Sequence, residues 1–295
     1  MQPRDDVYGA YDASYLQSGG PKTATQSPIV TGTSVIAIKF KDGVVMAADN
    51  LGTFSLLLNL SQTTNPPARH TSSPTILTLS LPASYGSLAR FTDVKRLRPF
   101  LSTSVVGFGG DVSDMQFLTR HLNELAIDEA YEHESSPPSD DPNAPPAGQL
   151  NAANLHKYLS KLMYRRRNDF DPLWNQILVA GFDSASSPFL ASVDLRGTTF
   201  TSPSLATGFG AMLAQPIMRR YAATEADAAR LTREEAVKVV QECMKVLFYR
   251  DARSLDRYSI AVVTKDGVEL SEDEQLERQS WAFAERIKGY GTQTV

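Results

Sequence analysis

A glycine followed by a threonine opens a predicted β-hairpin whose far end carries a carboxylate. Residues 35–40 (VIAIKF) are typical of a strand, Asp42-Gly43 is a strong hairpin signal, and a returning strand at 44–48 leads into Asp49. Pairing of the two strands can bring Asp49 close to Thr33. Cleavage after Gly32 would free the α-amine of Thr33, which can then act as the base for its own hydroxyl nucleophile. An ordinary β-hairpin with glycine at a bend is the commoner explanation of such a pattern.

The composition excludes several classes of protein. The chain has 295 residues, of which 42% are apolar, enough for one large domain with a substantial core. A formal charge of −4 provides no electrostatic footprint for nucleic acid. The single cysteine, Cys243, excludes an intramolecular disulfide and fits a reducing compartment. No stretch has the length of a transmembrane helix, and the N-terminus lacks the apolar core of a secretory signal.

Four segments interrupt the regular pattern. Residues 1–30 are rich in Gly, Ser, Thr and Gln and are predicted to be a leader or pro-segment with a short extension. Residues 53–83 contain seven Leu, four Pro and no Asp, Glu or Lys, and we interpret them as an insertion or a retained in-frame intron. Residues 134–150 form a Pro-rich loop, and residues 281–295 a C-terminal arm. The predicted domain therefore covers residues 31–280.

Elsewhere, helices occur in pairs between blocks of strands. Strands are predicted at residues 105–110, 176–182, 189–195, 198–201 and 258–264, whereas residues 272–288 are recognised only as a charged stretch. Apolar residues at three- and four-residue spacing predict two adjacent helices, one through Met115, Leu118, Leu122 and Leu125 and one through Leu155, Tyr158, Leu159, Leu162 and Met163. Thr232 and Glu235 form a capping box that starts a later helix. This order predicts an α/β (α+β) fold, a four-layer αββα sandwich.

Several separated motifs carry a resemblance to a known family. The segments GTSVIAIKFKDGVVMAADN, VVGFGGDVSDM, SLATGFGA and YRDARS resemble, in this order, the β-type subunits of the 20S proteasome core particle. Further segments, TQSPIVTGTSVI, DPLWNQILVAG and IKGYGTQ, are similar to a non-catalytic member of that family. The resemblance implies the N-terminal-nucleophile hydrolase fold. No cofactor or metal is expected, and the glycines at 107, 109 and 110 lack the spacing of a nucleotide-binding loop.

The resemblance also assigns six positions of the nucleophile site, which here are Thr33, Asp49, Arg96, Phe209, Asp251 and Ser254. Four of them match the active members, but Arg96 replaces a lysine and Phe209 replaces a serine. Lys95 precedes Arg96, and a one-residue slip would turn it to the opposite face. Arginine is permanently protonated and cannot exchange protons as a desolvated lysine can. Phe209 removes a hydroxyl and is expected to place its ring beside the amine of Thr33. We therefore expect no catalytic residue, with Asp49, Asp251 and Ser254 as buried hydrogen-bonding groups.

Assembly is what the resemblance implies for function. The partners would be the other proteasome α and β subunits of a twenty-eight-subunit particle, together with assembly chaperones, in ATP- and ubiquitin-dependent protein degradation in the cytoplasm and nucleus. Neither nucleic acid nor a membrane is an expected partner. The leader would be trimmed near Thr25, and the C-terminal arm would reach the opposite β ring to join half-particles.

Two alternatives stay open from the sequence. The first is an active threonine-type endopeptidase that uses Thr33, favoured by the matching Asp49, Asp251 and Ser254. The second is a stand-alone interaction protein with the same fold. Residues 53–83 favour it, because they lie between the two strands that line the family's substrate cleft and could obstruct assembly.

Overall fold

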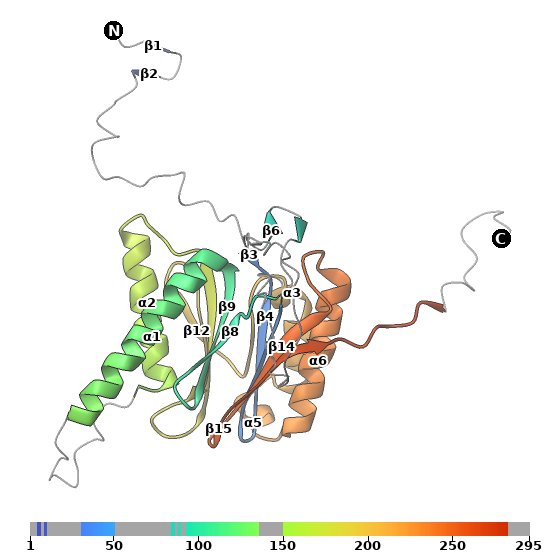
Figure 1. Ribbon diagram of the computed structural model, residues 1–295. Coiled ribbons are helices and arrows are strands. Elements are labelled where there is room, and N and C mark those ends of the chain that lie inside the picture. Colours follow the sequence, from blue (N-terminus) through green and yellow to red (C-terminus); the bar gives the residue numbers. More distant parts are fainter. Residues whose placement is uncertain are drawn as a thin grey trace, which may run out of the picture.

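The computed structural model describes residues 31–50, 93–135 and 150–282 (Figure 1). It also describes four two-residue strands, β1 (Asp5–Asp6), β2 (Gly9–Ala10), β6 (Ser84–Tyr85) and β7 (Leu88–Ala89). The rest of the predicted leader, the predicted insertion at 53–83, most of the Pro-rich loop and the arm beyond residue 282 lie outside the described residues.

Two antiparallel sheets stand face to face at the centre of the molecule (Figure 1). The six-stranded sheet has the order β12 (Thr199–Thr201), β11 (Pro188–Val193), β10 (Asn175–Phe182), β9 (Ser104–Asp111) and β3 (Thr31–Gly32), with β8 (Leu97–Phe100) also paired to β9. The five-stranded sheet has the order β13 (Ser204–Ala206), β4 (Val35–Phe40), β5 (Gly43–Asp49), β14 (Arg257–Thr264) and β15 (Gly267–Gln275).

A helical layer covers the outer face of each sheet. The six-stranded sheet is covered by α1 (Val112–Ser135) and α2 (Ala152–Asn168). The five-stranded sheet is covered by α3 (Gly210–Leu213), α4 (Gln215–Tyr221), α5 (Glu225–Ala228) and α6 (Arg233–Arg250). The predicted four-layer αββα sandwich is therefore confirmed, and it is the N-terminal-nucleophile hydrolase fold.

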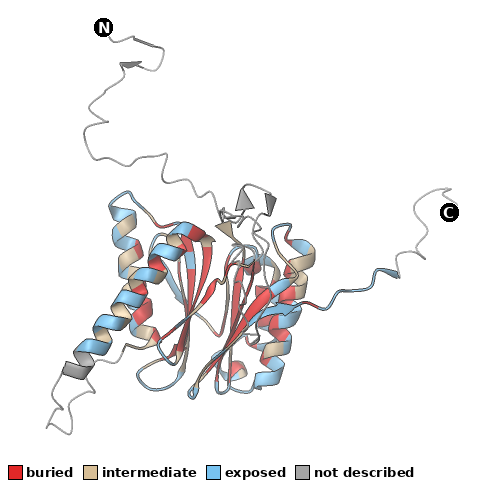
Figure 2. Cartoon of the chain, viewed as in Figure 1, coloured by how far each residue is buried: buried red, intermediate tan, exposed pale blue. Residues whose placement is uncertain are grey.

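The buried residues form three apolar layers between the four layers of the sandwich (Figure 2). Strand β4 shows how one strand serves two of them, because successive side chains point to opposite faces of a sheet. Ile36 and Ile38 pack toward α6, whereas Val35 and Ala37 pack against the other sheet. A strand buried on both faces has a nearly continuous apolar sequence, which is what residues 35–40 show.

The predicted hairpin of β4 and β5 is confirmed, and Gly43 is its first residue after the loop. Phe40 pairs with Gly43 across a two-residue loop, and Gly43 is not among the residues with positive φ. A Cβ on Gly43 would lie 1.9 Å from the carbonyl oxygen of Val263. The close approach of β14 to the hairpin therefore requires the glycine at this position.

Side chains cap the starts of two helices, and the second of these caps was predicted from the sequence. The Asp111 carboxylate accepts hydrogen bonds from the backbone N–H groups of Ser113 (3.1 Å) and Asp114 (3.2 Å) at the start of α1. Thr232 and Glu235 form the reciprocal capping box of α6. In contrast, β15 overlaps the start of the charged stretch 272–288 and was not predicted, because charges at an exposed sheet edge mask the strand pattern.

Candidate functional site

Thr33 and Asp49 meet at one end of the five-stranded sheet. Thr33 lies between β3 and β4, and Asp49 is the last residue of β5. The register of the hairpin pairs Val35 with Ala48, so the chain just before β4 passes the end of β5. The Thr33 hydroxyl donates a hydrogen bond to Oδ1 of Asp49, whose side chain is 1% exposed. The predicted proximity of these two residues is confirmed.

Arg96 occupies the centre of this site, and its guanidinium is fully engaged. It forms an ion pair with Asp49 Oδ1 from Nη2. Nε donates to the Asp49 carbonyl (3.1 Å), Nη1 to the carbonyls of Thr33 (2.8 Å) and Phe108 (3.3 Å), and Nη2 to the carbonyl of Ser34 (3.0 Å) and to Thr33 Oγ1 (3.3 Å). A guanidinium has five N–H donors in a fixed plane, and partners are present for all of them. The side chain is 1% exposed.

Burial and charge act in opposite directions on this ion pair. Burial raises the pKa of Asp49, while the charge of Arg96 and the hydrogen bonds from Thr33 and the Leu255 N–H oppose that rise. Burial lowers the pKa of Arg96, and the Asp49 carboxylate opposes that fall. Arginine starts from a pKa above 12 and stays protonated near neutral pH. Within the described ranges, the side chains hydrogen-bonded to the Thr33 hydroxyl are thus a carboxylate and a cation that cannot accept its proton.

Lys95 lies on the other face of its segment. Its ammonium forms an ion pair with Glu272 of β15, and its side chain is 33% exposed. Two backbone bonds fix this alternation: Val94 N–H donates to the Asn50 carbonyl (3.1 Å) and Phe108 N–H to the Arg96 carbonyl (3.0 Å). Arg96, and not Lys95, therefore faces Thr33.

Asp251 and Ser254 lie in the turn that follows α6, and this turn contacts Asp49 through the Leu255 N–H. Asp251 is buried, and its Oδ1 accepts the Arg253 N–H at 3.0 Å. Ser254 N–H donates to the Asp251 carbonyl (3.1 Å), and Leu255 N–H donates to Asp49 Oδ2 (3.4 Å). In the described part of the chain, however, Asp251 Oδ2 and Ser254 Oγ are buried without a hydrogen-bond partner. The expectation that the Ser254 hydroxyl holds the turn is wrong, because backbone bonds hold it.

Phe209 follows Gly208, whose φ of +57° makes the turn into α3. Its ring is 58% exposed and lines the cavity in front of Thr33. The turn is fixed by residues that the sequence reasoning missed. Ser34 Oγ accepts the Gly210 N–H (2.8 Å), and Thr207 Oγ1 accepts the Val35 N–H (2.8 Å). Small hydroxyl residues beside the glycines were the only sequence signal for these contacts.

A cavity of about 510 Å³ opens in front of Thr33, between β3, β9 and the turns after β11 and α6. Its wall includes Thr33, Trp174, Asn175, Arg196, Phe209 and Asp251. Asn175 is a further buried residue that the sequence reasoning missed: its amide nitrogen donates to the carbonyls of Gly109 (3.0 Å) and Asp111 (2.8 Å). In this cavity the Thr33 hydroxyl is held between the Asp49 carboxylate, to which it donates, and the Arg96 guanidinium, from which it accepts.

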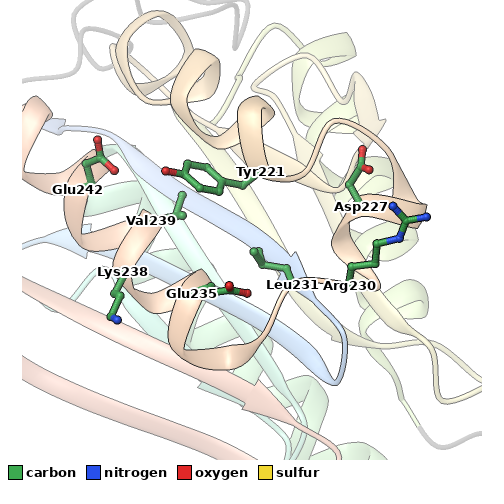
Figure 3. Close-up of a pocket in the computed structure, with 8 residues that line it drawn as sticks. All are labelled: Tyr221, Asp227, Arg230, Leu231, Glu235, Lys238, Val239 and Glu242. Carbon is green, nitrogen blue, oxygen red and sulfur yellow. The ribbon is translucent and has the colours of Figure 1, made fainter.

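A second cavity, of about 380 Å³, lies on the outer side between α4, α5 and α6 (Figure 3). Two of its carboxylates belong to helix caps: Asp227 accepts the Thr224 N–H (3.0 Å) and Glu235 the Thr232 N–H (3.0 Å). Its remaining charges, among them Arg230 and Lys238, point away from one another in Figure 3. This arrangement is that of two capped helices rather than of a catalytic centre.

Two other features are absent from the residues that the structure describes, which are 31–50, 93–135 and 150–282. No cluster of three or more His, Cys, Asp or Glu side chains in these ranges could hold a metal ion. Of the helices in these ranges, none combines the length and the apolar composition needed to cross a membrane.

Comparison with known proteins gives concordant matches. A family model described as "Proteasome subunit" matches residues 75–263. "Proteasome subunit beta type-7" of Saccharomyces cerevisiae is 40% identical over 296 residues, which covers 100% of this chain and 97% of that protein. "Probable proteasome subunit beta type-7" of Schizosaccharomyces pombe is 41% identical, covering 100% and 96%. "Proteasome subunit beta type-4" of Xenopus laevis is 36% identical over 274 residues, covering 92% of each chain.

Proposed function

The chain belongs to the proteasome subunit family, and we propose that it is the non-catalytic seventh β subunit of the 20S proteasome core particle. In this role it contributes to ring assembly and to the joining of half-particles in ATP- and ubiquitin-dependent protein degradation. Its partners are the other α and β subunits of a twenty-eight-subunit particle and assembly chaperones. It acts in the cytoplasm and nucleus.

The observation that carries this proposal is the buried guanidinium of Arg96. It bonds simultaneously to the Thr33 hydroxyl and the Asp49 carboxylate, and to the carbonyls of Thr33, Ser34, Asp49 and Phe108. A threonine nucleophile needs a group that takes up its proton. A guanidinium stays protonated, and its planar fork is held by fixed acceptors, so it acts as a structural cross-link between the segment before β4, the end of β5, and β9.

The surroundings of Phe209 support the same conclusion. Phe209 brings an exposed ring, and no hydroxyl, to the cavity that Thr33 lines. In the described ranges, Ser254 Oγ and Asp251 Oδ2 are buried and unpaired. A proton-transfer network needs continuous hydrogen bonds from one group to the next. Here the hydrogen bonds of Thr33 reach the turn after α6 through Asp49 and the Leu255 N–H, and Asp251 Oδ2 and Ser254 Oγ take no part in them.

The active-peptidase alternative rests on one specific observation, the hydrogen bond from Thr33 to Asp49. That bond keeps the nucleophile position in its place but leaves the hydroxyl between a carboxylate and a permanent cation. Cleavage at Gly32-Thr33, which would free an amine as base, would need the same chemistry beforehand. We therefore rank this alternative second.

Hydrolysis of fluorogenic peptides by the assembled particle tests the proposal directly. Particles containing Thr33→Ala are compared with particles containing Thr31→Ala, a matched change two residues upstream. We expect equal rates for both variants and for the wild type, and an intact mass in which the mature chain does not begin at Thr33. A selective loss of one peptidase activity with Thr33→Ala would refute the non-catalytic role.

Native mass spectrometry separates a particle subunit from a stand-alone protein with this fold. We expect the chain in a very large complex with other proteasome subunits. Recovery of the chain only as a free monomer would support the stand-alone alternative.

The segment that precedes the arm supports a role for the C-terminus in assembly. Leu276 is buried, and its N–H donates to the Asp256 carbonyl at 2.8 Å. The Gln279 N–H donates to the Tyr249 hydroxyl at 2.8 Å, and the Trp281 ring meets the Tyr249 ring edge-on at 5.7 Å. These contacts fix residues 276–281, which precede the proposed arm, against Tyr249 of α6 and against Asp256 just before β14.

A further inference from the structure

The outer edge of the six-stranded sheet is a short strand, β12, that no other element among residues 31–50, 93–135 and 150–282 covers. All three residues of β12, Thr199, Phe200 and Thr201, are exposed, and Phe200 is 64% exposed. The neighbouring strand β11 is largely buried, and α2 packs over β10 and β11. A three-residue strand that is exposed on both faces buries little apolar surface by itself. A further strand paired to its free edge would cover that surface.

The opposite edge of the molecule has the features that prevent such pairing. Strand β15 carries three exposed charged residues near its end, Glu272, Asp273 and Glu274, and its pairing with β14 contains a register shift between Tyr258 and Ile260. Charged side chains and bulges at an edge disfavour the addition of another strand. Strand β12 carries no charge. The edge at β12 therefore lacks the charges and the register shift that disfavour the addition of a strand at β15.

The register of the β11–β12 hairpin identifies which backbone groups face outward. The Asp194 N–H donates to the Thr198 carbonyl at 3.0 Å, which makes these two residues a hydrogen-bonded pair. Such pairs alternate in an antiparallel ladder, so the Phe200–Ser192 pair is also hydrogen-bonded. The N–H and C=O groups of Thr199 and Thr201 then point away from β11. They form a set of donors and acceptors that fits an extended backbone.

Cations border this edge. Ser160 Oγ donates to the Gly197 carbonyl at 3.0 Å, so the hairpin turn packs on α2. Lys157 and Lys161 lie within one helical turn of that contact, and Arg196 lies in the turn itself; all three are exposed. None of the ion pairs found among residues 31–50, 93–131 and 150–282 involves them. A partner with acidic side chains would complement this border, whereas a second copy of the same edge would bring like charges together.

We propose that β12 is a docking strand, to which an extended segment of an adjacent subunit adds as a further strand. The segment pairs with the outward groups of Thr199 and Thr201, covers the ring of Phe200 with an apolar side chain, and places acidic side chains near Lys157, Lys161 and Arg196. Main-chain bonds of this kind provide affinity, and the flanking side chains provide specificity. This inference rests on the proposed place of the chain in a multi-subunit particle.

Amide hydrogen exchange with residue-level fragmentation tests the docking strand on the wild-type chain. The Thr199 and Thr201 amides should exchange rapidly in the isolated chain and about tenfold or more slowly in the purified particle. The Phe200 amide, which faces β11, provides an internal reference. Rapid exchange at Thr199 and Thr201 in a particle that contains the chain would overturn the inference and leave the proposed function intact. If the chain is absent from the particle, the proposed function itself is wrong.

Two variants test the same surface independently. Thr201→Pro removes an outward N–H without removing a bond to β11, and an edge strand tolerates proline at such a position; Thr201→Val retains the N–H and is the matched control. We expect at least about tenfold lower incorporation of Thr201→Pro than of Thr201→Val into particles when each competes with the wild type. The double charge reversal Lys157→Glu/Lys161→Glu should also reduce incorporation. Equal incorporation of both Thr201 variants and of the charge-reversed variant would refute the docking strand.

Discussion

Replacement of Arg96 by methionine tests how the centre of the site is held together. Methionine retains most of the aliphatic length of arginine but removes the guanidinium. The substitution leaves the Asp49 carboxylate buried without its ion pair and deprives the carbonyls of Thr33, Ser34, Asp49 and Phe108 of a donor. Removal of one partner of a buried ion pair costs about 3–5 kcal/mol. That loss is a large part of the roughly 5–15 kcal/mol by which a domain is stable.

Urea denaturation of the purified chain, followed by far-UV circular dichroism, measures this cost. Arg98→Met is a matched control two residues along the same segment, because in the described part of the chain Arg98 Nε makes no hydrogen bond and Arg98 forms no ion pair. We expect Arg98→Met to cost less than about 1 kcal/mol, as for most substitutions away from a core network.

The double variant Arg96→Met/Asp49→Asn separates the charge from the packing. It removes the unpaired buried carboxylate, so its cost should fall below the sum of the two single costs by about 2 kcal/mol, within the range of coupled neighbours. Two results would contradict this reasoning. Arg96→Met could lower the free energy of unfolding no more than Arg98→Met does, or the losses of Arg96→Met and Asp49→Asn could simply add in the double variant.

Three further changes test other parts of the molecule. The double variant Arg96→Lys/Phe209→Ser should release some chains that begin at Thr33, because a lysine amine can exchange a proton and a serine supplies a hydroxyl; intact-mass measurement would detect them, and their absence would mean that other residues also prevent cleavage. Burial lowers the pKa of His156 below its ordinary value of about 6.5, so its contribution to stability is present above that pH and is lost as pH falls through the folded-state pKa. The urea midpoint of His156→Gln should therefore fall less than that of the wild type between about pH 7.5 and 5.5, and equal falls would exclude this contribution. Deletion of residues 289–295 should leave the chain foldable but raise the fraction of half-particles in native gels, whereas a normal yield of full particles would argue against the arm.

Local sequence patterns were sufficient for most of the elements. The Asp42-Gly43 signal and the apolar run 35–40 predicted the hairpin, and Thr232 with Glu235 predicted the start of α6. These features depend only on residues close in the sequence. Strand side chains alternate between two faces, and the two residues of a capping box are three positions apart. The paired order of helices and strands then led to the four layers, since each apolar face has to be buried against another element.

The pairing of strands that are far apart in the sequence could not be predicted from local patterns. Whether Arg96 or Lys95 faces Thr33 depends on a one-residue step, because adjacent side chains in extended backbone point to opposite faces. The backbone bonds from Val94 to Asn50 and from Phe108 to Arg96 decide that step.

The sequence by itself determined most of the elements, and its resemblance to a known family led to the expectation that Arg96 and Phe209 stand in place of a lysine and a serine. Only the tertiary structure decided that Arg96 bonds to both Thr33 and Asp49, that Ser34 receives the N–H of Gly210, and that the Ser254 hydroxyl is left without a partner in the described part of the chain. Ser34 and Gly210 are 176 positions apart. Contacts at such separations follow from the packing of complete sheets, and no local periodicity encodes them. The chain around Thr33 and the end of β5 are therefore joined by a buried ion pair between Arg96 and Asp49 that only the tertiary structure reveals.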